Sequence, residues 1–160
     1  MPIILDNRLE GDPVNELKLK RRLGKVLKAL GRPKASLGVL LAGDAELRGL
    51  NRDFRGKDAP TNVLAFPFED GDAAGAAPES PAQPLPSVMK GYLGDVAVSL
   101  ETVARQAEET GAGTGELLYF YLIHGILHLT GHDHELGPAE AEAQDRETER
   151  LLGLIPRTLK

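Results

Sequence analysis

Cysteine is absent from all 160 residues of the sequence. A disulfide framework and a thiolate metal site are therefore both excluded, and any transition-metal site must be built from His, Asp or Glu. The sequence also lacks a basic N-terminal segment followed by an apolar core, and its longest apolar run, residues 117–129, is too short to span a bilayer. These absences predict a cytoplasmic protein that does not contact a membrane.

A surplus of basic residues is absent too. The chain has 19 Lys and Arg against 24 Asp and Glu, a net charge of −5, which as an average argues against a polyanionic partner. The distribution is uneven, however, because residues 1–60 hold 13 basic and 8 acidic side chains whereas residues 61–160 hold 6 and 16. One positive face for nucleic acid is therefore possible, and the acidic last helix is expected to point away from it.

The length and the apolar fraction of 41% predict one globular domain over residues 1–160. Residues 69–90 are rich in Gly, Ala, Pro and Ser, and they are expected to form a long mobile loop within that domain. Strands are predicted at residues 3–7, 37–41, 62–66 and 92–99. Helices are predicted from Pro13 to about residue 30, from an Asp44 cap to near Asn51, from a Ser99 cap to Glu109, and over 117–129 and 138–152. Residues 52–58 are expected to form a charged loop.

Five cations are expected to form a stripe on the first helix, opposite its apolar face. They are Lys18, Arg21, Arg22, Lys25 and Lys28, which recur at helical spacing. Such a stripe is suited to RNA phosphates, although an ordinary solvated helix face is the commoner role of such residues.

The most informative segment is His124-Gly-Ile-Leu-His128-Leu-Thr-Gly131-His-Asp133-His134. His124 and His128 are four residues apart in a predicted helix, so both rings project from one face at a spacing that suits one metal ion. Gly131 can turn the chain back, which makes His134 a candidate third ligand. Three imidazoles and one open position indicate a catalytic site for one Zn²⁺ ion, although nickel or copper also suits this donor set.

Two neighbours of these histidines have other expected roles. His132 is interpreted as a surface or packing residue. Asp133 either bonds a ligand imidazole or caps a local turn. Gly125 stands where the long zinc-protease motif has a glutamate that acts as general base, so the sequence argues against peptide hydrolysis.

The histidine segment resembles the signature of the YbeY family, bacterial endoribonucleases specific for single strands and associated with ribosomal RNA maturation. Two further segments resemble blocks of that family. Residues 50–58 with 60–67 resemble its strand-entering block, and residues 93–96 resemble its edge-strand block. Departures from the family pattern are His132, Ala65 and the long 69–90 loop.

The resemblance implies an α+β fold in which a small mixed four-stranded sheet packs against helices, with the zinc motif on a central helix. It implies zinc held by His124, His128 and His134, and a functional arginine at Arg55. A guanidinium can hold a phosphate through two bonds. From the sequence alone a solvated loop arginine is the preferred interpretation of Arg55, and the resemblance reverses that preference. Further substrate-binding candidates are Lys18, Arg21, Arg22, Lys25, Arg52 and Lys57.

The leading hypothesis is a zinc-dependent, single-strand-specific endoribonuclease. The resemblance implies a role in ribosomal RNA processing, including maturation of the 16S 3′ end, and in ribosome quality control, with ribosomal RNA and the ribosome as partners. One alternative is a noncatalytic ribosome-assembly factor whose metal is structural and whose basic stripe docks on RNA. Another is a zinc hydrolase that acts on a different substrate.

Overall fold

The computed structural model describes residues 3–9, 14–59, 61–68, 91–131 and 136–156. The predicted 69–90 loop therefore lies outside the described residues. The strands are β1 (Ile3–Asn7), β2 (Ser36–Ala42), β3 (Val63–Pro67) and β4 (Tyr92–Ser99). The helices are α1 (Glu16–Ala29), α2 (Asp44–Arg55), α3 (Leu100–Thr110), α4 (Thr114–Leu129) and α5 (Pro138–Leu152).

The four strands form one mixed sheet in the order β1-β2-β4-β3, which confirms the predicted α+β fold. β1, β2 and β4 run parallel to their neighbours, whereas β3 runs antiparallel to β4. The expectation that residues 93–96 form an edge strand is wrong, because β4 lies between β2 and β3. Its residues Val96, Ala97 and Val98 are all buried, as is typical of a strand that is covered on both faces.

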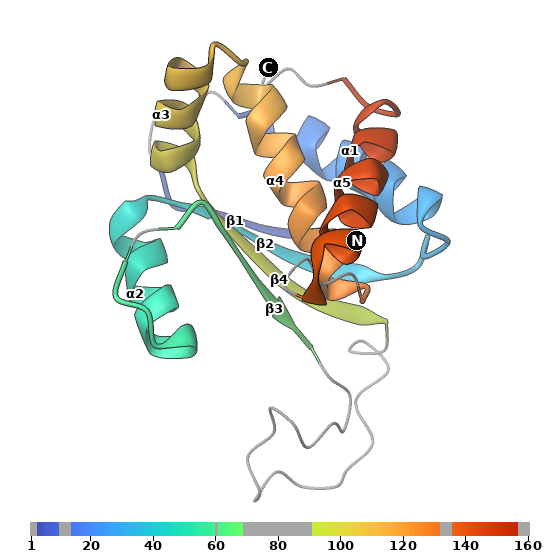
Figure 1. Cartoon of the computed structure of the whole chain (residues 1–160). Coiled ribbons are helices and arrows are strands. Elements are labelled where there is room, and N and C mark those ends of the chain that lie inside the picture. Colours follow the sequence, from blue (N-terminus) through green and yellow to red (C-terminus); the bar gives the residue numbers. More distant parts are fainter. Residues whose placement is uncertain (1–2, 10–13, 60, 69–90, 132–135, 157–160) are drawn as a thin grey trace, which may run out of the picture.

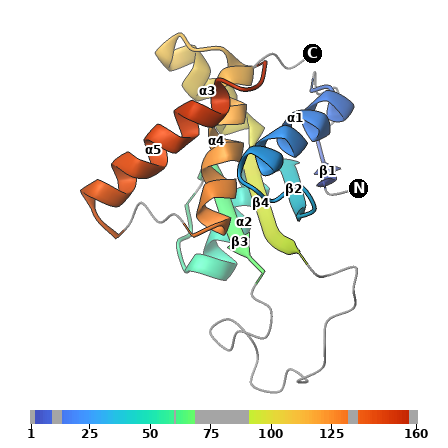
Figure 2. The same ribbon diagram turned by 90° about the vertical axis from the view of Figure 1, so that its right-hand side faces the viewer.

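Helices cover both faces of this sheet (Figure 1). α1, α4 and α5 lie on one face and α2 lies on the other, and α1 and α5 flank α4 on opposite sides (Figure 2). Alternate residues of β4 face opposite sides of the sheet. Val96 and Val98 belong to the larger core, and Ala97 belongs to the smaller cluster with Leu47 of α2. Within the described ranges, no helix is long and apolar enough to cross a membrane.

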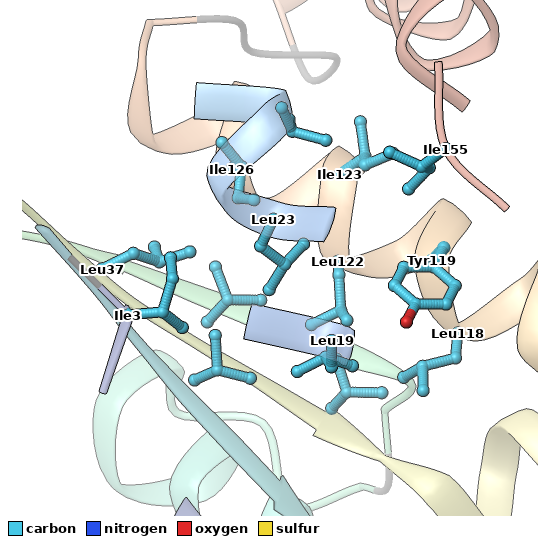
Figure 3. Close-up of a cluster of buried hydrophobic side chains, with 14 of the residues drawn as sticks. Ile3, Leu19, Leu23, Leu37, Leu118, Tyr119, Leu122, Ile123, Ile126 and Ile155 are labelled. Atoms are coloured by element: carbon cyan, nitrogen blue, oxygen red, sulfur yellow. The ribbon is translucent and has the colours of Figure 1, made fainter. Parts of the chain in front are cut away.

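α4 lies at the centre of the larger core, as predicted. Leu19 and Leu23 from α1 meet Leu122 and Ile126 from α4, and all four side chains are fully buried (Figure 3). Each such leucine or isoleucine stabilises the fold by about 1.5–3 kcal/mol relative to an exposed position. The burial of α4 therefore fixes the backbone from which His124 and His128 project.

The helix boundaries partly differ from the predicted ones. Asn15 caps α1 by accepting a bond from the Lys18 amide at 3.0 Å, so the helix begins at Glu16 rather than at Pro13. Ser99 caps α3 as predicted, accepting from the Thr102 amide at 3.2 Å. α2 is longer than predicted and includes Arg52 to Arg55, because the chain leaves the helix only at Gly56, where φ is +73°.

Asp44 is the first residue of α2 and is not its cap, which is Gly43. Its carboxylate instead accepts bonds from Ser99 Oγ and Thr102 Oγ1, each at 2.6 Å, and from Arg105 at 2.7 Å. Burial by itself raises the pKa of Asp44, but these hydrogen bonds outweigh it and lower the pKa from 3.8 to about 2. Asp44 therefore joins the start of α2 to the start of α3 in its charged form.

The low pKa of Asp44 predicts a loss of stability in acid. A carboxyl group whose pKa is lower in the folded state stabilises that state above the unfolded pKa of 3.8, and this contribution disappears as the pH falls through about 2. Asp44→Asn should lower the free energy of unfolding by about 1–2 kcal/mol at pH 7, allowing for partial exposure of the group. Urea unfolding at pH 7 and near pH 2 should show the variant and the parent converging in acid. A constant difference would contradict this account.

Candidate functional site

His124 and His128 lie one turn apart on α4, and both side chains are half-buried. The His124 ring stacks on Phe120 with 6.3 Å between ring centroids and 20° between ring planes, and its Nδ1 atom is buried. Packing on one side of the ring restricts its rotation. The two histidines therefore lie one turn apart on α4, as predicted, and their role as metal ligands stays a prediction.

α4 ends at Leu129, and the Thr130 hydroxyl donates to the carbonyl of Leu127 at 2.9 Å. Gly131 follows with φ of +111°, which confirms the predicted glycine turn. His132, Asp133 and His134 lie outside the described residues, so the third proposed ligand and the proposed imidazole partner remain predictions. The described part of the chain contains no group of three His, Cys, Asp or Glu side chains that could hold a metal ion.

Two of the three proposed ligands lie in the described residues, and their chemistry suits a transition-metal ion. Two neutral imidazoles at a spacing of four residues suit zinc, copper or nickel, and they rise from a helix that the core holds in place.

Gly125 sets how closely α4 approaches the sheet. A Cβ atom at this position would lie 2.7 Å from Cγ1 and 3.1 Å from Cγ2 of Val96, and 3.5 Å from Cγ2 of Val63. A side chain at 125 would therefore push α4 away from β3 and β4. The sequence shows that the protease glutamate is missing, and the structure adds that this position points into the sheet, where a general base has no room.

Gln144 of α5 is a site residue that the sequence analysis missed. Its side chain is fully buried, and its Nε2 donates to the backbone carbonyl of His124 at 3.0 Å. Thr148, one turn later, is also fully buried and donates to the carbonyl of Gln144 at 2.8 Å. The signal was present in the spacing of Gln144, Thr148 and Leu151, which lie along one face of the last helix.

The predicted phosphate-binding residues Arg52, Arg55 and Lys57 are exposed at the end of α2. Arg55 lies in the last helical turn, Arg52 pairs with Asp53 at 3.1 Å, and Lys57 follows Gly56. A hydrogen bond ties the segment after α2 back to the helix, because the buried Asn51 donates from Nδ2 to the Ala59 carbonyl at 2.9 Å. Arg55 is thus a helical residue rather than a loop residue, and its backbone is fixed.

One member of the predicted basic stripe on α1 is not on the surface. Lys18, Arg21, Lys25 and Lys28 are exposed, whereas Arg22 is 8% exposed. Its guanidinium donates to the Tyr119 hydroxyl at 3.2 Å and lies 5.5 Å from the centre of the Tyr119 ring. The prediction that Arg22 faces a substrate is therefore wrong. Its position at the margin of the apolar face turns it toward α4.

The cations of α2 and the histidines of α4 lie on different faces of the sheet. α2 and α4 lie on opposite faces, and the edge strand β3 contacts both (Figure 1). The histidines of α4 and the cations of α2 therefore lie on either side of one sheet edge rather than on a common face. The acidic α5 flanks α4 on the side opposite α1 (Figure 2). It is also packed directly against the histidine helix, through Gln144.

Comparison with known proteins gives a consistent result. Residues 5–154 match the family model described as Endoribonuclease YbeY. Two curated relatives named Endoribonuclease YbeY cover nearly the whole chain. The one from Geobacter sulfurreducens is 40% identical over 95% of this chain and 96% of its own, and the one from Geobacter metallireducens is 35% identical over 98% and 97%. The solution structure of TM1509 from Thermotoga maritima is similar, with a TM-score of 0.59 and 28% identity, covering 95% of this chain and 90% of the other.

The close contact at Gly125 predicts a specific steric coupling. Gly125→Ala should lower the free energy of unfolding by about 1–3 kcal/mol, because the new methyl group overlaps Val96. Combined with Val96→Ala, the loss should be smaller than the sum of the two single losses by about 1 kcal/mol or more. Gly24→Ala is the control, since a Cβ there has no neighbour within 4 Å. Urea unfolding of the four variants measures the coupling, and strictly additive effects would contradict the contact.

Because Arg22 is buried and Arg21 is exposed, the same substitution should affect stability differently at the two positions. Arg22→Glu should lower the free energy of unfolding by about 3 kcal/mol or more, because it places a carboxylate among buried groups. Arg21→Glu, on the exposed face, should change it by no more than about 0.5 kcal/mol. Thermal and urea unfolding of the pair measure the difference. Equal effects would mean that Arg22 is solvent-facing after all.

Proposed function

The chain belongs to the endoribonuclease YbeY family, and from this premise we propose that it is a metal-dependent endoribonuclease acting on single-stranded RNA. The observation that carries the proposal is the agreement between that family match and the pair of imidazoles one turn apart on α4. The exposed cations of α1 and α2 support it, because RNA affinity depends on phosphate neutralisation. We further propose ribosomal RNA as the substrate, maturation of the 16S 3′ end and ribosome quality control as the role, and the ribosome as the partner.

His124, His128 and His134 are the residues that would hold the metal, with zinc as the proposed ion. The chemistry that zinc supplies when bound is Lewis-acid polarisation of a phosphate oxygen. The two described histidines would contribute imidazole nitrogens from a helix that the packing of the core holds in place. Gln144 fixes the His124 backbone, and Asp133 is proposed to orient a ligand ring.

Arg55 is proposed to bind the scissile phosphate. A guanidinium can donate two parallel hydrogen bonds to phosphate oxygens, and it stabilises negative charge that develops there during cleavage. The flanking cations Arg52 and Lys57 would hold the adjacent phosphates. Lys18, Arg21 and Lys25 on α1 lie on the other face of the sheet and would hold phosphates farther along the strand. Arg22 is removed from this set, because its guanidinium is buried against Tyr119.

Cleavage of a single-stranded RNA by tag-free protein of known metal content tests the proposal. We expect one zinc per chain and cleavage by the parent protein. His128→Ala should lose both the metal and the activity, whereas Arg55→Ala should keep the metal and lose about 100-fold in kcat. Arg146→Ala is the control, since this exposed arginine pairs with Glu142 on the acidic helix. Circular dichroism of every variant checks folding.

Each alternative function has its own outcome in the same experiment. RNA binding without cleavage above contaminating nuclease would favour the noncatalytic assembly factor. Turnover of a peptide or ester faster than RNA would favour a hydrolase of another substrate. Normal cleavage by Arg55→Ala would show that this side chain does not grip the scissile phosphate.

A further inference from the structure

Phe54 is an exposed aromatic side chain that the proposed metal centre does not use. The inner face of α2 runs through Leu47, Leu50 and Asn51, and Phe54 continues this face by one turn. Leu47 is fully buried against the sheet, whereas Phe54 is 68% exposed. Its ring contacts the Phe66 ring of β3 edge to face, with 5.3 Å between centroids. Most of the Phe54 side chain is therefore open to solvent beside β3.

A groove runs along the sheet beside this ring. It has a volume of about 430 Å³, and its apolar lining includes Leu40, Leu50, Phe54, Phe66, Tyr92 and Ala97. This volume lies within the range of small-molecule sites, so the groove can admit a planar group the size of a nucleobase. Three charged residues also line it, namely Asp6, Asp95 and Arg8, and the Arg8 guanidinium is already paired with the Asp6 carboxylate at 3.0 Å, so the lining carries a net negative charge. An uncharged ring is therefore favoured inside the groove over a phosphate.

Outside the groove, the charged side chains next to Phe54 favour binding of phosphate groups. Arg52, Arg55 and Lys57 are all exposed within three residues of Phe54. The ion pair between Arg52 and Asp53 is itself exposed, so it contributes little and leaves the arginine accessible to phosphate. An aromatic face beside several cations is the combination by which proteins bind unpaired nucleotides, because the ring stacks on a base while the cations hold the backbone.

We propose that Phe54 is a stacking platform for one unpaired base of the RNA strand, with the flanking phosphates on the cations of α2. This inference rests on the proposed function for the class of substrate. It places part of the RNA on the sheet face opposite α4, so the strand passes round the edge formed by β3. A stacked base requires a base that is not paired, and Phe54 thereby contributes to the preference for single strands.

Phe54→Trp provides a direct probe, because the chain contains no other tryptophan. The variant is titrated with a 2′-O-methyl oligouridylate of about eight nucleotides, within the usual site size for such strands. Stacking should quench the tryptophan emission in a saturable way. An abasic oligonucleotide of the same length carries the same phosphates without bases and should leave the emission unchanged. Equal emission changes with both strands, or no change with either, would overturn the proposal.

Binding measurements on three further variants distinguish aromatic stacking from the effect of side-chain size. Thermal unfolding of the same variants checks that each one folds. Phe54→Ala and Phe54→Leu should each bind the oligouridylate about 10-fold more weakly, whereas Phe54→Tyr should bind it as the parent does. With the abasic strand, all three should match the parent. Leu154→Ala removes another exposed apolar side chain and is the control. Thermal unfolding should change little, since the Phe54 side chain is mostly exposed. Parent-like binding by Phe54→Ala would overturn the proposal.

The two proposals can fail separately. If the parent protein cleaves RNA while Phe54→Trp shows no base-dependent quenching, the endoribonuclease stands and the stacking role falls. If quenching depends on bases but no preparation cleaves RNA, Phe54 remains a base-binding residue and the catalytic proposal falls.

Discussion

The structure depends on the contact between α4 and the sheet at Gly125. α4 packs against β3 and β4, and even a Cβ atom at position 125 would lie only 2.7 Å from Cγ1 of Val96. Interiors are packed to a density at which one added methyl group forces a shift of neighbouring atoms. The helix therefore has one position on the sheet, and His124 and His128 inherit that position. The glycine that removes a protease base is the same residue that places the two imidazoles.

The positions of the exposed charges follow from the way the helices are distributed over the two faces of the sheet. The exposed cations of α1 and α2 lie on opposite faces of the sheet, and the acidic α5 lies beside α4 on the side away from α1 (Figure 2). Inside this arrangement, charged groups act as links between elements. Asp44 joins the starts of α2 and α3, and Arg22 joins α1 to Tyr119 of α4. A net charge of −5 therefore describes neither the proposed RNA-binding surfaces nor the interior.

Local signals predicted most of the fold. The Ser99 cap and the apolar run of α4 each identified their element, because each signal depends on residues close together in the chain. The end of α2 was predicted a turn too early, since its charged residues resemble a loop and the left-handed conformation at Gly56 is the actual stop. For the candidate site, spacing alone predicted that His124 and His128 lie one turn apart on a helix. The bond from Gln144 was missed because it joins a side chain to a backbone atom 20 residues away.

The sequence by itself determined which side chains are available: histidines at helical spacing, no thiol, no general base at 125 and clustered cations. Residues three or four positions apart in a helix lie on the same face, so the sequence alone places the two histidines together and the cations together. Only the tertiary structure decided which of those side chains point to solvent. Arg22 and Phe54 show this most clearly, since the basic stripe contains a buried arginine and the apolar face of α2 ends in an exposed phenylalanine. Burial depends on what a neighbouring element covers, and α4 reaches Arg22 whereas the sheet leaves most of Phe54 uncovered.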